Sequence, residues 1–328
     1  MMSRTVLVTG GAGFIGSHTC KLLARHGIAP VTFDNLSRGN RRAVKWGPMV
    51  VGDILDTAAL VATMEMYRPE AVIHFAALAY VGESVTDPAP YYRVNVAGTH
   101  SLLEACRKSG TRNVVFSSSC ATYGIPDQLP ISESAPQKPI NPYGRTKLIG
   151  EQMLEDYAAA YGIRHVILRY FNASGADPEG DIGEWHEPET HIIPRALMAA
   201  YGTIPHLAVF GDDYETDDGT CVRDYIHVND LARAHALAVD YLDSGGANVA
   251  VNLGAGRGVS IHEILGSIEA TTRRKVPVRI ERRRPGDPPV LFADPARARR
   301  VLGFTAEMSD IDTIVRTAAP FFERRRAA

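Results

Sequence analysis

The chain has 328 residues, 45% hydrophobic and 22% charged, which is typical of a soluble globular protein with one large or two modest domains. Its 35 Lys and Arg against 37 Asp and Glu leave a net charge of -2, which argues against a dedicated nucleic-acid binder, whose binding domain is usually strongly basic. No apolar run approaches the roughly 18 residues of a membrane helix, and the four cysteines lack the CxxC spacing of a metal or redox site, so we expect a cytoplasmic enzyme without a membrane partner or a metal.

The first 170 residues alternate between short strand patterns and helical patterns. A β-branched run at Thr5–Thr9 predicts the first strand, and Phe14–His26 predicts a helix that ends near Gly27. Further strands are predicted at the ranges Pro30–Asp34, Ala71–Phe75 and Asn113–Ser117. This alternation indicates βαβ units, so the expected fold is α/β with a doubly wound parallel sheet of the Rossmann type.

The second half has a different pattern. Asn172–Arg195 is rich in Gly, Pro, Asp and Glu and predicts a long ordered excursion. A helical pattern then returns at Val228–Leu242, and Val249–Leu253 predicts another buried strand. We therefore expect a sheet domain of residues 1–172 plus about 226–256, and a smaller, discontinuous C-terminal α/β domain of about 173–225 plus 257–328.

A glycine loop lies between the first predicted strand and the first predicted helix. Its glycines at 10, 11, 13 and 16 allow the backbone to approach a pyrophosphate, which the N–H groups of the helix N-terminus can bind. Asp34 ends the next strand, 18 residues after Gly16, where an acidic residue binds the ribose 2′-hydroxyl of a dinucleotide. Because a carboxylate disfavours a 2′-phosphate, the loop predicts NAD rather than NADP.

A tyrosine and a lysine share one helix face. Asn141 and Pro142 are typical of a helix start, so Tyr143 and Lys147 lie one turn apart. A phenol is a poor base at neutral pH, but a neighbouring ammonium and a positively charged nicotinamide favour its ionised form. Ser119, in the serine run at the end of a predicted strand, could share the proton that Tyr143 takes.

Several sequence blocks together resemble the UDP-glucose 4-epimerases of the extended short-chain dehydrogenase/reductase family. They are TGGAGFIGSH, VIHFAA, SSSCATYG, NPYGRTK, RYFNASGAD and DGTCVRDYIHV, and they span nearly the whole chain. The resemblance implies that the phenolate of Tyr143 removes the proton of the sugar 4-hydroxyl while a hydride passes to bound NAD. The 4-keto sugar then turns over, and the hydride returns to its opposite face.

The same resemblance implies two sets of site residues. Those around NAD are Gly10, Gly13, Phe14, Ile15, Gly16, Asp34, Asn35, Asp53, Ile54, Phe75, Ala76, Ala77, Asn95, Ser117, Tyr143, Lys147 and Tyr170. Those around the UDP-sugar are Ser119, Tyr143, Asn172, His191, Ile192, Ala208, Phe210, Arg223, Arg284, Asp287 and Leu291. Arg223 and Arg284 also suit a diphosphate on chemical grounds, because a guanidinium meets phosphate with a planar fork.

Other functions remain open at this point. A related 4-epimerase could act on UDP-xylose and UDP-arabinose or on N-acetylated sugars, and Leu291, where many strict relatives carry Tyr, would leave room for an N-acetyl group. A nucleotide-sugar dehydratase would need an Asp-Glu pair where this chain has Cys120 and Ala121. A non-catalytic NAD-sensing protein would not need Tyr143, Lys147 and Ser119 together. We also expect a homodimer through the helical ranges Pro90–Lys108 and Pro142–Tyr161.

Overall fold

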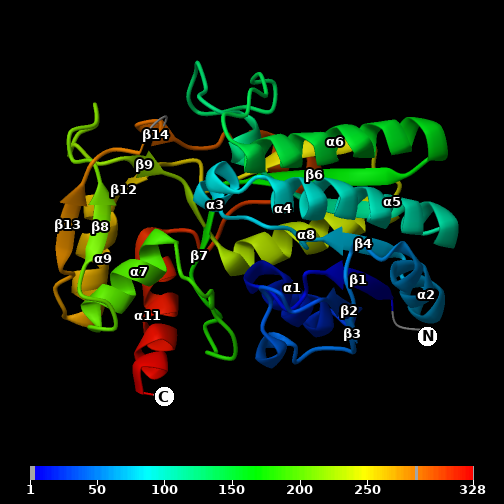
Figure 1. Ribbon diagram of the computed structural model, residues 1–328, viewed down its shortest axis with the longest axis horizontal. Coiled ribbons are helices and arrows are strands. Elements are labelled where there is room, and N and C mark those ends of the chain that lie inside the picture. Colours follow the sequence, from blue (N-terminus) through cyan, green and yellow to red (C-terminus); the bar gives the residue numbers. More distant parts are fainter. Residues whose placement is uncertain (1–3, 285–286, 328) are drawn as a thin grey trace.

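A computed structural model describes residues 4–284 and 287–327 (Figure 1). Its centre is a sheet of seven parallel strands in the order β11-β6-β5-β4-β1-β2-β3, so the predicted doubly wound α/β fold is confirmed. The strands are β1 (Thr5–Thr9), β2 (Ala29–Asp34), β3 (Met49–Val51), β4 (Ala71–His74), β5 (Asn113–Ser119), β6 (Arg164–Tyr170) and β11 (Val249–Leu253).

Helices cover both faces of this sheet, which explains why its strands are apolar on both sides. On β1, Val6 and Val8 face one hydrophobic core and Leu7 faces the other. The first core is closed by α1 (Phe14–Arg25), α8 (Val228–Asp243) and α10 (Ala296–Leu302). The second is closed by α2 (Thr57–Tyr67), α5 (Gly98–Ser109) and α6 (Pro142–Tyr161).

Shorter elements complete this part of the molecule. They are two 3-10 turns, η1 (Arg41–Ala43) and η3 (Cys120–Thr122), the helices α3 (Val81–Thr86) and α4 (Ala89–Tyr91), and a π-helical stretch, η2 (Tyr92–Ala97). The helix α4 and the stretch η2 lead directly into α5. The single helix expected over Pro90–Lys108 therefore consists of three successive segments, α4, η2 and α5.

A second part lies beside the end of the sheet, at the left of Figure 1. Its core is formed by α7 (Ile192–Ala200), α9 (Ile261–Thr272) and α11 (Ile311–Ala327). Small sheets flank them: β8 (Leu207–Phe210) with β13 (Val278–Glu281), and β9 (Val222–Arg223) between β12 (Val259–Ser260) and β14 (Val290–Leu291). The pair β7 (Asn172–Ser174) and β10 (Tyr225–His227) leads from the large sheet to this part.

Element boundaries largely follow the sequence patterns. Gly27 follows α1 with a positive φ of 74°, and the Asn141 side chain accepts a hydrogen bond from the backbone N–H of Gly144 at the start of α6. The excursion predicted over Asn172–Arg195 is shorter than expected, because α7 already begins at Ile192. Within the described ranges, no helix combines the length and apolar character needed to cross a bilayer.

Candidate active site

The glycine loop lies where the strand order reverses, between β1 and β4. Gly10 has a φ of +73°, and a Cβ atom there would lie 2.6 Å from the backbone nitrogen of Ala76, just after β4. A Cβ on Gly16 would lie 2.2 Å from the carbonyl oxygen of Gly10. The loop therefore excludes side chains at these positions, and α1 begins beside it at Phe14 and Ile15, where the N-terminal N–H groups of a helix suit a pyrophosphate.

Asp34 lies directly beside this loop and is hydrogen bonded to it. Its carboxylate accepts hydrogen bonds from the backbone N–H groups of Ala12 (3.0 Å) and Leu36 (2.8 Å). The side chain is buried at the end of β2, and this burial raises its pKa. The next side chain, Asn35, donates to Asp53 at 3.1 Å. These groups fit the adenosine end of a dinucleotide, because a carboxylate at this strand end can accept a ribose hydroxyl.

The segment after β4 lies on the other side of the glycine loop from Asp34 and lines the expected cofactor site. Phe75 packs against His235 with ring centroids 4.5 Å apart, and Ala76 and Ala77 follow it. Ile54 is buried, and a Cβ on Gly98 would meet its Cδ1 atom at 2.5 Å.

Asn95 holds this segment in place from within. Its buried amide donates to Leu78 O (3.0 Å) and Thr146 Oγ1 (2.9 Å), and its oxygen accepts from Leu78 N–H (2.8 Å). All these bonds are made to the chain itself, so Asn95 positions the segment and the start of α6.

The catalytic candidates converge at the carboxyl end of β5. Tyr143 and Lys147 project from the first two turns of α6, and both are buried. The Lys147 ammonium donates to Ser117 O at 2.7 Å and lies 5.9 Å from the centre of the Tyr143 ring. The Ser117 hydroxyl is hydrogen bonded to the Tyr170 hydroxyl, and Ser119 lies within hydrogen-bonding reach of Tyr143.

Burial controls the ionisation of this group. It raises the pKa of Tyr143 above its usual range, and the hydrogen bond with Ser119 lowers it. Burial also lowers the pKa of Lys147 to about 8, although the nearby Glu151 carboxylate raises it. In the chain by itself, desolvation is therefore the largest influence on the pKa of Tyr143.

A buried ion pair supports the site from behind and was missed by the sequence analysis. Arg169 on β6 and Glu151 on α6 are 2.6 Å apart, with side-chain exposures of 9% and 5%. Glu151 also accepts hydrogen bonds from Ser118 and Gln137, and Arg169 donates to the Tyr123 hydroxyl. In the sequence, each of these charged residues stands in an apolar element, which suggests a buried charge. This pattern does not show which residue pairs with which.

The residues expected around the nucleotide sugar lie mainly on the second part. Asn172 donates to Asp224 O at 2.9 Å, and Leu291 is the strand partner of Arg223. The Arg223 guanidinium lies 2.5 Å from Asp287, so these two residues form an ion pair.

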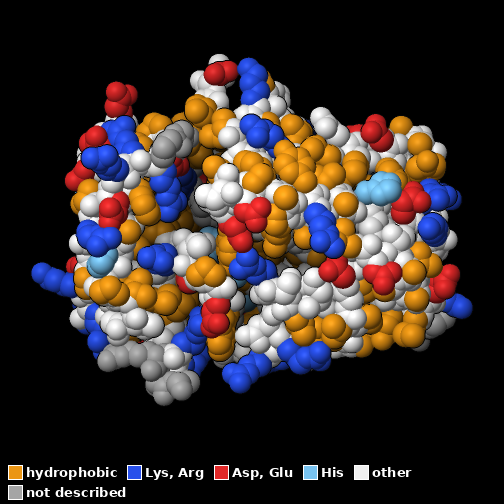
Figure 2. All heavy atoms as spheres, in the orientation of Figure 1, with side chains coloured by type: hydrophobic (Ala, Val, Ile, Leu, Met, Phe, Trp, Pro, Cys, Tyr) orange, Lys and Arg blue, Asp and Glu red, His pale blue; other side chains and the backbone are white. Residues whose placement is uncertain are grey.

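A guanidinium also stacks on a ring in this group. Arg284 stands 4.0 Å over Phe210, which follows Ala208 on the same half-buried face of β8. Figure 2 shows the surface hollowed between this part and the sheet part, with Lys and Arg side chains near the hollow.

His191, expected at the sugar nucleotide, contacts two carboxylates of its own loop. It directly precedes Ile192, the first residue of α7, and its Nδ1 atom lies 2.5 Å from Glu184 and 3.4 Å from Glu189. Burial would lower the pKa of His191, but the two carboxylates raise it to about 10. The spacing of Glu184, His186, Glu189 and His191 was a signal that the sequence analysis did not use.

Comparisons with known proteins agree with this geometry. The model of the NAD dependent epimerase/dehydratase family matches residues 6–254. The UDP-glucose 4-epimerase of Rhizobium leguminosarum bv. trifolii is 55% identical over 97% of each chain.

Two solved structures are also similar. UDP-glucose 4-epimerase from Brucella ovis in complex with NAD is 67% identical, with a TM-score of 0.97 over 98% of this chain and 99% of that one. The enzyme from Stenotrophomonas maltophila, with bound NAD and formylated UDP-arabinopyranose, is 41% identical, with a TM-score of 0.95 over 99% and 100%.

Proposed function

The chain belongs to the NAD dependent epimerase/dehydratase family, and on this premise we propose that it is an NAD-dependent enzyme that inverts C4 of a UDP-hexose, interconverting UDP-glucose and UDP-galactose. The observation that carries the proposal is the pair Tyr143 and Lys147, buried one turn apart beside the end of β5 and next to a glycine loop without room for side chains. Relatives named UDP-glucose 4-epimerase, two of them solved with NAD, support it.

Tyr143 is the general base in this proposal. Its phenolate takes the proton of the sugar 4-hydroxyl, and the Ser119 hydroxyl next to it shares that proton. Lys147, held by the carbonyl of Ser117, keeps a positive charge near the phenol. When bound, NAD supplies a hydride acceptor that can return the hydride. Because Tyr143 can return the proton after the sugar has turned, one residue serves both directions.

The second part of the chain would hold the nucleotide sugar. Arg223 and Arg284 are the proposed diphosphate ligands, since UDP brings about two negative charges that guanidinium groups bind well. The other proposed contacts are Asn172, His191, Ile192, Ala208, Phe210, Asp287 and Leu291. In this division of labour, residues 1–172 plus about 226–256 bind NAD, and about 173–225 plus 257–328 bind the sugar nucleotide.

An assay against three sugar nucleotides tests this function. The purified protein should interconvert UDP-galactose and UDP-glucose, with UDP-N-acetylgalactosamine and UDP-xylose measured in parallel. Turnover of UDP-xylose alone would favour the pentose epimerase, and water elimination from the sugar would favour a dehydratase.

We also propose that the protein is a cytoplasmic homodimer. Its four cysteines are free thiols, two of them fully buried, which suits a reducing compartment. Figure 2 shows hydrophobic side chains gathered over α6, and the aromatic residues Tyr92 and Tyr161 are 39% and 52% exposed on the two helical segments expected at the interface. Apolar patches of this kind are typical of protein contacts.

The protein is expected to purify with NAD bound. NAD is regenerated in every turnover of the proposed cycle, so catalysis does not require its release. The buried Asp34 carboxylate would repel the negative charge of a 2′-phosphate, which favours NAD over NADP. Acid denaturation should release NAD, identified by mass. Release of NADP instead would contradict the role of Asp34.

Two glycine variants provide the control for this result. Gly16→Ala should release little dinucleotide, because its Cβ would lie 2.2 Å from a backbone oxygen of the loop. Gly266→Ala, on α9, has no atom within 4 Å of the added Cβ and should release as much as the parent.

Leu291→Tyr is expected to reduce turnover of UDP-N-acetylglucosamine more than turnover of UDP-glucose. Leu291 is half-buried and packs against a cluster that includes Phe171, as does Cys120, which follows the proposed catalytic Ser119 in the chain. A tyrosine there adds volume where the N-acetyl group would lie. Steady-state rates on both sugars test this, and equal losses on both, or no N-acetyl activity in the parent, would show that the position does not gate the pocket.

A further inference from the structure

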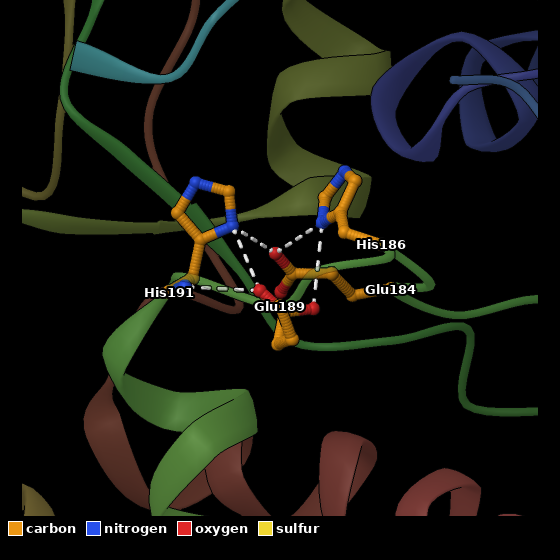
Figure 3. Close-up of side chains that lie close together, drawn as sticks. All are labelled: Glu184, His186, Glu189 and His191. Carbon is orange, nitrogen blue, oxygen red and sulfur yellow. Dashed lines mark hydrogen bonds and ion pairs between the residues drawn. The ribbon is translucent and has the colours of Figure 1, made fainter. Parts of the chain in front are cut away.

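Four side chains with metal-ligating groups gather on one short loop between β7 and α7. They are Glu184, His186, Glu189 and His191, and one ligand atom from each lies within 4.8 Å of the others. Figure 3 shows the two imidazole rings on either side of the carboxylates, each with its Nδ1 atom turned toward them. The loop thus brings two nitrogen and two oxygen ligands to one point.

The spacing of these atoms suits a tetrahedral metal ion. Bonds of about 2.0–2.1 Å to a central ion give a tetrahedron with edges of about 3.3 Å. His186 Nδ1 lies 3.3 Å from Glu184 Oε1 and 3.4 Å from Glu189 Oε2, both close to that edge. His191 Nδ1 lies 3.4 Å from the other carboxylate oxygen of Glu189, Oε1. His191 Nδ1 and Glu184 Oε1, at 2.5 Å, would have to move apart.

The same atoms lack ordinary hydrogen-bond partners. Glu184 Oε1, His186 Nδ1 and Glu189 Oε2 are buried, and none makes a hydrogen bond of acceptable geometry. The other oxygen of Glu189 accepts from the N–H groups of Thr190 (2.8 Å) and His191 (2.9 Å), which fixes that carboxylate with Oε2 toward the cluster. These atoms therefore meet only as ion pairs, and a bound cation would give each of them a direct bond.

A second acidic cluster in this chain has its negative charge balanced by a lysine. The carboxylates of Asp177, Glu179 and Asp181 surround the Lys21 ammonium at 2.7, 2.9 and 2.8 Å. Among the residues with described side chains, no Lys or Arg pairs with Glu184 or Glu189. Their two negative charges face His186 and His191, and one divalent cation would balance them in place of the protons on these rings.

We propose that Glu184, His186, Glu189 and His191 form a structural site for Zn²⁺. Two imidazoles and two carboxylates suit this ion, whereas Ca²⁺ and Mg²⁺ take six or more oxygen ligands. Four protein ligands leave no open position, so the ion would hold the loop rather than react. The rings of Phe14 and Tyr80 lie 6.4 and 6.0 Å from His186, so the ion would connect this loop to the glycine loop and to the start of α3.

Zinc binding to the full-length, NAD-loaded protein tests the proposal. After chelator treatment and gel filtration, the parent should take up one Zn²⁺ per chain and melt at a higher temperature with the ion. His186→Ala and Glu189→Gln should bind at least about tenfold more weakly. Glu189→Gln keeps the oxygen that the backbone N–H groups need. The matched control is His262→Ala, because His262 is exposed and lies 3.6 Å from Asp218.

Cobalt provides a measurement that needs no variant. Co²⁺ bound by the parent should show the intense visible absorption of a tetrahedral site, and Zn²⁺ should displace it. The proposal is overturned if the parent binds no stoichiometric Zn²⁺, if the two ligand variants bind like the His262→Ala protein, or if bound Co²⁺ has the weak spectrum of an octahedral ion. The cluster would then be two histidine–glutamate ion pairs.

Discussion

Replacing Tyr143 with Phe is expected to lower the turnover of UDP-galactose by about 10²-fold to 10⁴-fold, the usual cost of losing a general base. The phenylalanine ring still fills the buried position on α6, so the fold and the neighbouring Lys147 remain in place. The proposed diphosphate ligands, Arg223 and Arg284, lie on other elements. Affinity for UDP, measured by calorimetric titration, should therefore stay close to that of the parent.

The matched control is Tyr161→Phe. Tyr161 ends the same helix, is 52% exposed, and lies more than four turns away along α6. This variant should retain the parent rate. A Tyr143→Phe protein with the parent rate would contradict the catalytic assignment, as would a loss of UDP affinity as large as the loss of rate.

Glu151→Gln is expected to lower the free energy of unfolding by about 3–5 kcal/mol, the usual cost of removing one partner of a buried ion pair. The substitution keeps the side-chain shape but leaves the Arg169 guanidinium, 2.6 Å away and 9% exposed, without its counter-charge. Urea denaturation followed by circular dichroism measures the change.

Glu155→Gln, one turn further along α6, is the control for this experiment. Glu155 is 66% exposed and pairs with His165 at 3.3 Å, so its loss should change the unfolding free energy by less than about 0.5 kcal/mol. Equal effects of the two substitutions would show that the buried pair does not stabilise the fold.

Features coded by neighbouring residues could be predicted from the sequence. The glycine loop, the strand–helix alternation and the Asn141-Pro142 helix start depend on local backbone preferences, and all are present in the structure. The same holds for Tyr143 and Lys147, because a spacing of four residues on one helix fixes their shared face.

Features that depend on distant residues could not be predicted. The ion pair between Glu151 and Arg169 joins a helix to a strand, and nothing in either segment identifies the other. The burial that raises the pKa of Tyr143 likewise comes from the folded surroundings, which the sequence does not show. The His and Glu cluster is a different case, since its ligands lie within eight residues, but His191 was considered alone.

The fate of deuterium placed at C4 of UDP-galactose tests the proposed function most directly. The account predicts that the purified protein, without added NAD, forms UDP-glucose that retains the deuterium at C4, because the hydride removed from that carbon is returned to it. Formation of UDP-glucose with deuterium lost to water, or failure to form the C4 epimer at all, would contradict the account.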